Sequence, residues 1–321
     1  MSNNQISECK VRTATIVSPC YNEVDNVEEL VLRVCQTMDA LPYLYKLLFI
    51  DNASTDGTQE KLREISRQNK NVQVILNARN FGHIKSPVYG LLQSDSDVTI
   101  LIASDLQDPP EILPQLFAKW EAGYKAVMAV KPVSDENRIL FSLRKLFYRI
   151  INAIAEVEPV ANATGAGLFD RKVIEALRGI DDSYPYFRGL IAEIGFPIAT
   201  VEFHQPRRKR GVTKNNFYTL LDIGLLGLTN HSKVPLRLMT LIGFLFSVIG
   251  MVIAAGYFLA KLIWWNSLEF GLAPAVIGVF LLSSIQLMSL GILGEYVGSI
   301  HTQVRKLPLV TESERINFEE T

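Results

Sequence analysis

Short apolar runs alternate with amphipathic stretches along the first 130 residues. The strands that we predict are Ala14–Val17, Leu47–Ile50, Val72–Leu76, Val98–Ile102 and Ala126–Val130. Helical spacing of apolar residues lies between them, over 58–67, over 84–93 and after Pro110. This alternation favours an α/β fold, with a mostly parallel sheet covered by helices.

The first predicted helix follows the first strand. Asp25 and Glu28 have the spacing of a capping box, which closes the start of a helix. Apolar residues of this helix share one face, namely Val27, Leu30, Val31 and Val34. We therefore expect the helix to begin near residue 26 and to pack on the sheet.

Two long uncharged stretches lie in the last third of the chain. They run from 238 to 260 and from 270 to 294, about 23 and 25 residues. Each exceeds the roughly 20 residues that cross a bilayer as a helix. We predict a C-terminal transmembrane helical hairpin. The alternative is a pair of buried core helices, which the length and adjacency of the two stretches disfavour.

The charges that flank the hairpin predict its orientation. Lys233 and Arg237 precede the first stretch, and Arg305 and Lys306 follow the second. Basic residues favour the cytoplasmic side of a membrane. We therefore predict a multi-pass protein of the inner or plasma membrane, with both termini in the cytoplasm.

The predicted domain organisation has four parts. They are a cytosolic domain at 1–214, juxtamembrane amphipathic helices at 215–237, two transmembrane helices at 238–298 and a cytosolic tail at 299–321. The apolar spacing in 215–236 fits a helix lying in the membrane surface. It fits a core helix of the soluble domain nearly as well.

The balance of charged residues bears on which classes of macromolecule the protein binds. Lys and Arg number 32 against 33 Asp and Glu. Proteins that bind nucleic acid through its phosphates usually carry a clear basic excess, so we expect no nucleic-acid partner.

Polar segments follow four of the predicted strands, at 18–23, 51–58, 80–83 and 104–110. In a parallel sheet these segments meet at the edge where ligands bind. The chain has neither the Gly-x-Gly-x-x-Gly motif of dinucleotide binding nor a Walker loop. Asp105, Asp108 and Gln107 offer the hard oxygen atoms that suit Mg²⁺ or Mn²⁺ on a diphosphate. Strand-end aspartates also serve as turns and helix caps, a role that suits Asp56 equally well.

The same segments resemble a known family. Their sequences are SPCYNE at 18–23, IDNASTDGT at 50–58, NFGH at 80–83 and DLQDPPE at 105–111. In this order they are similar to the motifs of family-two inverting glycosyltransferases. The closest branch comprises the dolichol-phosphate mannose synthases and bactoprenol glucosyltransferases, which act on polyisoprenyl phosphates. Segments 181–190 and 208–214 resemble the acceptor-side elements of that branch.

This resemblance implies a GT-A fold, a nucleotide-sugar donor and a divalent metal, Mg or Mn. The nucleotide-binding residues that it implies are Pro19, Tyr21, Glu23, Asp51 and Asn80. The implied metal ligands are Asp105, which is also catalytic, and Gln107. The implied ligands of the lipid phosphate are Arg208, Thr213 and Lys214. Arginine and lysine near a membrane suit a phosphate on physical grounds too, although 207–210 also fits a general anionic-lipid patch.

Three positions depart from the family pattern. Ala103 replaces the first carboxylate of the Asp-x-Asp motif, Asn52 replaces a second aspartate, and no aspartate follows Thr164-Gly165. We hypothesise that Glu193 takes over part of the lost acidic function as a catalytic residue. A Glu193 paired with an arginine is the alternative. A lipid phosphate is mostly dianionic at pH 7, so it needs little help from a general base.

The predicted reaction transfers a hexose from a UDP- or GDP-sugar to polyisoprenyl (undecaprenyl) phosphate with inversion, at the cytoplasmic face. The alternative is a catalytically silent, nucleotide-sugar-binding membrane scaffold. A processive synthase is disfavoured because the chain has no Gln-x-x-Arg-Trp motif. The sequence leaves open whether the chain forms a homo-oligomer. Because the sugar-linked lipid would be made inside the cell, we expect a flippase to act on it afterwards.

Overall fold

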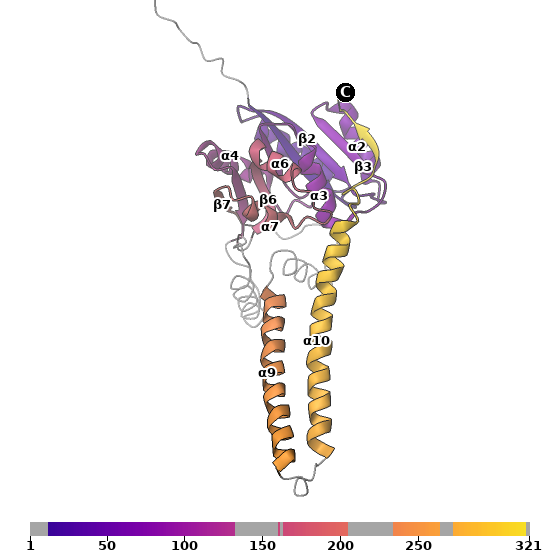
Figure 1. The fold of residues 1–321 in the computed structure, drawn as a ribbon. Coiled ribbons are helices and arrows are strands. Elements are labelled where there is room, and N and C mark those ends of the chain that lie inside the picture. The colour runs from indigo at the N-terminus through magenta and orange to yellow at the C-terminus, as the bar shows by residue number, and fades with distance from the viewer. Residues whose placement is uncertain (1–11, 132–159, 161–162, 205–233, 264–271, 319–321) are drawn as a thin grey trace, which may run out of the picture.

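Eight strands form one sheet in the computed structural model, which describes residues 12–131, 160, 163–204, 234–263 and 272–318 (Figure 1). The strands are β1 (Thr13–Cys20), β2 (Leu44–Asp51), β3 (Val72–Asn77), β4 (Val98–Leu101), β5 (Ala126–Val130), β6 (Ala163–Asp170), β7 (Ile198–Glu202) and β8 (Glu312–Ile316). The helices are α1 (Val27–Met38), α2 (Thr58–Gln68), α3 (Gly82–Leu92), the short 3₁₀ helix η1 (Pro110–Ile112), α4 (Leu113–Glu121), α6 (Arg171–Arg178), α7 (Phe187–Glu193), α9 (Val234–Ile263) and α10 (Leu272–Val304).

The sheet has the order β7-β5-β6-β4-β1-β2-β3-β8. The pairs β1–β2, β1–β4, β2–β3 and β5–β7 are parallel. Strand β6 runs antiparallel to both of its neighbours, and β8 runs antiparallel to β3. The predicted α/β class and the five predicted strands are confirmed. Because β1, β2 and β4 are parallel neighbours, the loops that follow them lie at one edge of the sheet.

Apolar clusters cover both faces of the sheet. Leu30 of α1, Leu62 of α2 and Leu116 of α4 belong to one buried cluster. Residues of α3, α6 and α7 belong to the other, which includes Leu91 and Val173. Burial on both faces explains why the central strands read as continuous apolar runs rather than alternating ones.

Helix α3 lies unusually close to the sheet. A Cβ atom at Gly90 would lie 2.6 Å from Cγ1 of Ile50 and 2.7 Å from Cγ1 of Val17. No side chain fits there without displacing the side chains of Ile50 and Val17. The glycine therefore sets the position of α3, and with it the position of the loop that begins α3.

The predicted capping box is wrong. Helix α1 begins at Val27, and the side chain of its N-cap residue, Asn26, makes no capping hydrogen bond. Instead, the backbone amides of Asn26 and Val27 donate to the carbonyl oxygen of Glu23, at 2.9 and 3.1 Å. Asp25 lies in this turn, one residue before the cap position. The predicted apolar face is confirmed, with Val27, Leu30 and Val34 buried.

The C-terminal segment is part of the sheet. Residues Glu312–Ile316 pair with β3, so that Ile316 lies opposite Val74. The side-chain Nδ2 of Asn317 then donates to the carbonyl oxygens of Ser66 and Val72, at 2.6 and 2.8 Å. Our prediction of a cytosolic tail at 299–321 missed this strand. Its sequence is polar because it lies at an edge, yet it supplies the backbone partners that β3 lacks on that side.

Helices α9 and α10 extend side by side away from the sheet (Figure 1). Their large apolar side chains face outward, and Phe244 and Phe280 are 68% and 70% exposed. Within the described ranges, Gly278–Val304 is long and apolar enough to cross a membrane, and Leu238–Ile253 is a shorter apolar stretch. Of the predicted juxtamembrane part, 234–237 belongs to α9, and 215–233 lies outside the described residues.

Candidate active site

Side chains join the loops after β1 and β2. The backbone amide of Asn22 donates to Oγ of Ser54 at 2.8 Å, and the amide of Thr55 donates back to Oδ1 of Asn22 at 2.8 Å. The amide of Glu23 donates to Oγ1 of Thr58 at 3.0 Å. These crossed bonds hold the two loops together as one surface.

Asp51 lies inside this surface. It ends β2 with no exposed area, and its Oδ2 accepts the amide of Ser54 at 3.0 Å and Nε2 of Gln59 at 2.8 Å. Among the other predicted nucleotide ligands, Pro19 is the last but one residue of β1, and Tyr21 and Glu23 follow directly. The structure thus brings these four residues together, with Asp51 organising the loop from within.

Asn52 connects the second loop to the third. Its Nδ2 donates to Oδ1 of Asn80 at 2.9 Å and to the carbonyl of Gly82 at 3.2 Å. Its Oδ1 accepts from Nδ2 of Asn77 at 3.1 Å and from the amide of Phe81 at 2.8 Å. A carboxylate has no hydrogen to donate. Asn52, which stands where the family has an aspartate, therefore positions Asn80 through a bond that a carboxylate could not donate.

The loop after β4 is attached to β1 by two serines. Oγ of Ser104 lies 2.7 Å from Oγ of Ser18 and donates to the carbonyl of Pro19 at 2.9 Å. Both serines are buried. Our sequence interpretation gave them no role, because spacing alone does not reveal that two hydroxyls meet across a sheet.

Two carboxylates lie in the loop after β4. The half-buried Asp105 accepts the amide of Gln107 at 3.1 Å. Asp108 is only 5% exposed, and its Oδ2 accepts the amide of Ala103, where the family's first aspartate is missing, at 3.4 Å. Its Oδ1 has no hydrogen-bond partner among the described residues. Burial, and then the charge of Asp105, raise the pKa of Asp108 to about 6.

Left-handed backbone occurs in three of these loops. Asn22, Ala53 and Leu106 have φ of 59°, 60° and 59°. Asparagine tolerates this conformation, whereas alanine and leucine pay a steric cost of roughly 1–2 kcal/mol. Such strain is concentrated at functional sites because the surrounding structure must enforce it. Its presence after β1, β2 and β4 supports this edge as the site.

The donor atoms here fit a hard divalent cation. Asp105, Gln107 and the buried Asp108 offer carboxylate and amide oxygens, which Mg²⁺ and Mn²⁺ prefer. Across the described part of the chain, no group of three His, Cys, Asp or Glu side chains is arranged as a metal site.

The remaining predicted residues lie elsewhere or outside the described ranges. Glu193 ends α7 and is exposed. Its predicted catalytic role stays a hypothesis. The predicted lipid-phosphate ligands Arg208, Thr213 and Lys214 lie outside the described residues.

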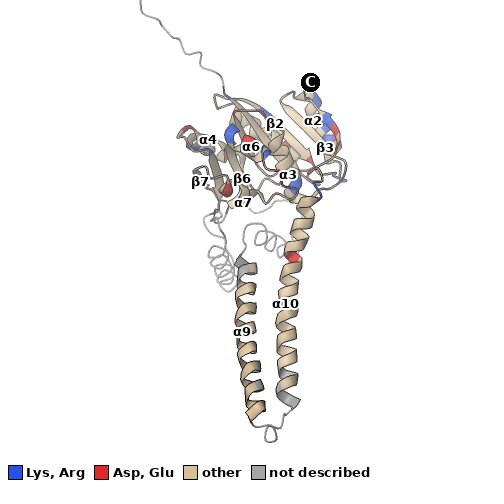
Figure 2. Cartoon of the chain, in the orientation of Figure 1, with Lys and Arg blue, Asp and Glu red and all other residues tan. Residues whose placement is uncertain are grey.

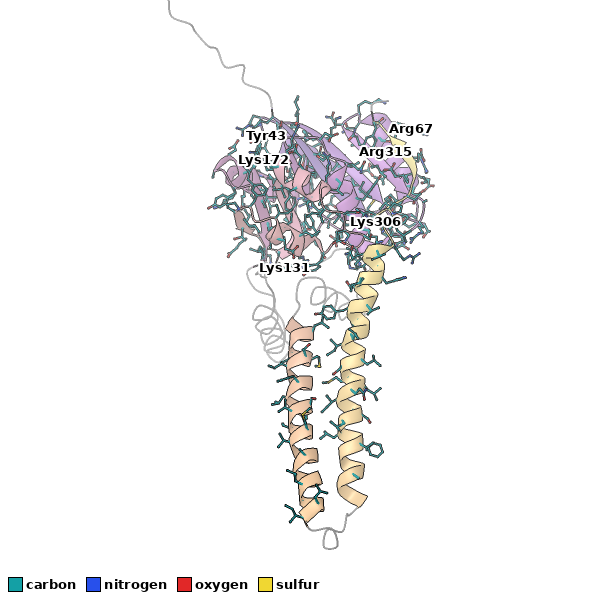
Figure 3. All side chains as sticks on the ribbon, in the orientation of Figure 1. Tyr43, Arg67, Lys131, Lys172, Lys306 and Arg315 are labelled. Carbon is teal, nitrogen blue, oxygen red and sulfur yellow. The ribbon has the colours of Figure 1, made fainter. Side chains whose placement is uncertain are left out.

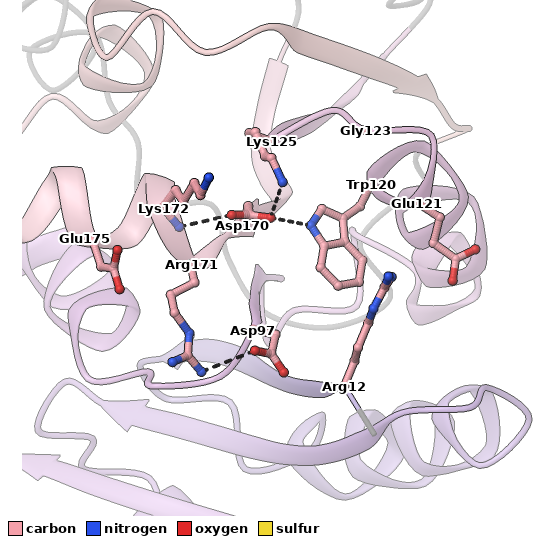
Figure 4. Close-up of a pocket in the computed structure, with 10 residues that line it drawn as sticks. All are labelled: Arg12, Asp97, Trp120, Glu121, Gly123, Lys125, Asp170, Arg171, Lys172 and Glu175. Carbon is pink, nitrogen blue, oxygen red and sulfur yellow. Dashed lines mark hydrogen bonds and ion pairs between the residues drawn. The ribbon is translucent and has the colours of Figure 1, made fainter. Parts of the chain in front are cut away.

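A concave region of about 570 Å³ lies at the opposite edge of the sheet (Figure 4). Its carboxylates bond within the protein. Oδ2 of Asp170 accepts Nε1 of Trp120 at 2.8 Å and Nζ of Lys125 at 2.9 Å, and Asp97 pairs with Arg171 at 3.4 Å. Burial acts to raise the pKa of Asp170, but these hydrogen bonds outweigh it and hold the pKa below its ordinary value. This network is structural, and it joins β4, β6 and α4.

The fold and the loops together define an α/β protein whose sheet carries polar and acidic loops at the carboxyl edge of its parallel strands. Residues 15–178 match the model of the family described as Glycosyl transferase family 2. The chain belongs to this family, and it is a glycosyltransferase.

Its relatives match nearly the whole chain. An uncharacterized glycosyltransferase of Synechocystis sp. is 30% identical, over 94% of each chain. The SfII prophage-derived bactoprenol glucosyl transferase of Shigella flexneri is 28% identical, over 94% of this chain and 99% of the relative. A solved structure, the glucosyl-3-phosphoglycerate synthase of Mycobacterium tuberculosis, has 17% identity and a TM-score of 0.48, covering 68% of this chain and 78% of that one.

Proposed function

We propose that this glycosyltransferase moves a hexose from a nucleotide-sugar donor to a polyisoprenyl phosphate, with inversion, at the cytoplasmic surface of a membrane. One observation carries the proposal. The acidic loops at the carboxyl edge of the sheet belong to a domain that is continuous with two long helices whose apolar side chains face outward. A lipid acceptor suits such an arrangement because its phosphate stays at the surface while its chain stays in the bilayer.

The relatives support the choice of acceptor. Two bactoprenol glucosyl transferases and a prophage homolog of one align with 92% or more of this chain. A soluble acceptor would give no reason to retain the apolar pair. We therefore propose bactoprenol-type, that is undecaprenyl, phosphate as the acceptor and a UDP- or GDP-hexose as the donor.

The proposed roles follow the positions of the side chains. Pro19, Tyr21, Glu23, Asp51 and Asn80 would line the nucleotide site. Asp105 and Gln107 would hold Mg²⁺ or Mn²⁺, with Asp108 close by as a further oxygen ligand. A bound divalent cation would neutralise charge on the leaving diphosphate. The loops would contribute mainly by orienting donor and acceptor for a single displacement.

The domain boundaries and location form part of the proposal. The sheet domain would be cytosolic, with α9 and α10 as two membrane crossings and both termini on the cytoplasmic side. Arg208, Thr213 and Lys214 would meet the lipid phosphate at the surface. A flippase would act on the product, and self-association of the chain is compatible with this arrangement.

The test uses the purified full chain, undecaprenyl phosphate and labelled UDP- and GDP-sugars, with Mg²⁺, Mn²⁺ or EDTA. We expect metal-dependent transfer of label into the lipid phase from one donor. Asp105→Asn should lower kcat by about a hundredfold or more, as removal of an electrostatic stabiliser does. Asp95→Asn is the matched control, because its side chain is 87% exposed and precedes β4 at the other edge.

The three departures from the family pattern favour a second candidate, a silent nucleotide-sugar-binding scaffold. This alternative predicts that the nucleotide binds while no donor gives transfer under any metal condition. Nucleotide binding without turnover would therefore replace the enzymatic proposal.

A further inference from the structure

Basic side chains gather where the sheet domain meets the end of α10. Arg79 precedes α3, Lys85 lies in its first turns, and Arg305 and Lys306 follow α10. Figure 2 shows basic residues at this junction, and Figure 3 labels Lys306 there. This surface is the end of the domain that faces the apolar helices.

Gln303 and Lys306, at the end of α10, bind the segment 181–183, and we call these contacts the clamp. Nε2 of Gln303 donates to Oδ1 of Asp182 at 2.6 Å, and Oε1 of Gln303 accepts the amide of Ser183 at 3.1 Å. Lys306 pairs with Asp181 at 2.9 Å. The clamp fixes the segment that carries Tyr184, and Nζ of Lys85 lies 5.6 Å from the centre of the Tyr184 ring.

Arg79 is oriented on the neighbouring loop. Its guanidinium lies 4.0 Å from the centre of the Phe81 ring and donates to the carbonyl of Asn80 at 3.1 Å. Asn80 is the residue that Asn52 holds at the candidate nucleotide site. The basic cluster therefore borders the proposed donor site directly.

Within the described part of the chain, the positive charge of this cluster exceeds the negative charge of its acidic neighbours. Lys306 forms an ion pair with Asp181. Asp182 accepts hydrogen bonds from the side chain of Gln303 and from the backbone amide of Tyr184. Among the described residues, no carboxylate forms an ion pair with Arg79, Lys85 or Arg305. Burial, and then the positive charges of Arg79 and Arg305, lower the pKa of the half-buried Lys85, with Asp182 acting the other way.

Gathering three cations costs free energy unless an anion joins them. Guanidinium and ammonium groups bind phosphate through strong charge-assisted hydrogen bonds, and at a membrane surface phosphate is available on lipids. We propose that Arg79, Lys85 and Arg305 bind a lipid-borne phosphate at the foot of α10, beside the loop that carries Asn80. We assign this phosphate to the polyisoprenyl acceptor, and that assignment rests on the proposed function.

The test measures binding of farnesyl phosphate, farnesol and phosphatidylglycerol to the full chain in neutral detergent micelles, without donor. Each lost charge-assisted contact should weaken phosphate binding about tenfold. We therefore expect Lys85→Gln and Arg305→Gln each to weaken farnesyl phosphate binding about tenfold, and the double variant further. Farnesol should bind equally weakly to all variants because it lacks the phosphate.

Two controls match the charge change. Arg67 is exposed on α2 and Lys119 is exposed on α4, both away from the junction (Figure 3 labels Arg67). Arg67→Gln and Lys119→Gln should bind farnesyl phosphate as the natural chain does. Lys85→Arg should restore most of the affinity, which a merely structural role of Lys85 would not require. Equal thermal stability of the variants would show that the domain remains folded.

The outcomes separate the sources of the phosphate. Loss of farnesyl phosphate binding with unchanged phosphatidylglycerol binding supports the acceptor. Loss of both farnesyl phosphate and phosphatidylglycerol binding would show that the three cations bind anionic lipids in general. That result would overturn the assignment of the phosphate to the acceptor. Unchanged binding of both probes in the double variant overturns the site. If the natural chain binds farnesyl phosphate yet transfers no sugar, the proposed function fails while the site stands.

Discussion

Single side chains determine how the loops of the candidate site are held. Asn52 uses both ends of its amide, donating to Asn80 and Gly82 and accepting from Asn77 and Phe81. The sequence shows this residue only as a missing carboxylate. Its role depends on which donors and acceptors surround it, and spacing along the chain does not contain that information. The same is true of Ser18 and Ser104.

Replacing Asn52 with aspartate should destabilise the protein. The carboxylate would lose both donated bonds and face the oxygens of Asn80 and Gly82, so we expect about 1–3 kcal/mol less free energy of unfolding. Denaturant titration of the full chain in micelles measures this difference. Asn71→Asp, at an exposed position before β3, is the control. Equal stability of the two variants would contradict the role we give to Asn52.

Asp170 should make stability depend on pH in the acid range. Its folded pKa lies below the ordinary value of 3.8, so its contribution is present above that pH. The contribution is lost as pH falls through the folded pKa, when both states bind the proton. We expect Asp170→Asn to cost about 1–3 kcal/mol at pH 7 and progressively less below about pH 4. Unfolding curves of both proteins across this range give the difference, and a constant difference would refute the charge-based explanation.

Individual elements differ in how readily the sequence reveals them. Five strands follow from apolar runs, because strands buried on both faces need such runs. Strands β6, β7 and β8 were not predicted. Strand β6 contains Gly165 and Gly167, which weaken the strand pattern, and β8 is a polar edge strand. Their positions depend on neighbours far away in the sequence.

The packing of α3 gives a prediction at this scale. Gly90→Ala would place a methyl group within 2.7 Å of Ile50 and Val17, so we expect a loss of about 1–3 kcal/mol despite the better helix propensity of alanine. Gly243→Ala is the control, since no atom lies within 4 Å of its added Cβ. Thermal unfolding of both variants in micelles tests this. A Gly90→Ala protein as stable as the control would show that the side chains of Ile50 and Val17 rearrange without cost, which would contradict the role we give to Gly90.

The whole molecule combines an enzyme domain with an apolar helix pair. The order of the four polar loops along the sequence, together with the rule for parallel sheets, predicts that they share one edge. The site's general position was therefore accessible from sequence. The sequence did not reveal that the chain returns to the sheet after α10, because the pairing of β8 with β3 joins segments more than 230 residues apart.

The proposed topology predicts how the chain reacts with thiol reagents in cells. In a chain without its natural cysteines, Ser267→Cys lies in the connection between α9 and α10, and Lys70→Cys lies in the sheet domain. We expect a membrane-impermeant maleimide to label the first variant in intact cells and the second only after lysis. Labelling of Lys70→Cys in intact cells, or protection of Ser267→Cys there, would rule out a cytoplasmic domain on a two-crossing hairpin.

The pairing of β8 with β3 also constrains the order in which the protein is made. Strand β8 leaves the ribosome after both apolar helices. Until then the outer edge of β3 lacks its partner, and bare edges invite wrong pairing. The domain is thus completed only after the hairpin has been synthesised, so a chain that stops early, or whose hairpin is misplaced, leaves an open edge that quality control can recognise.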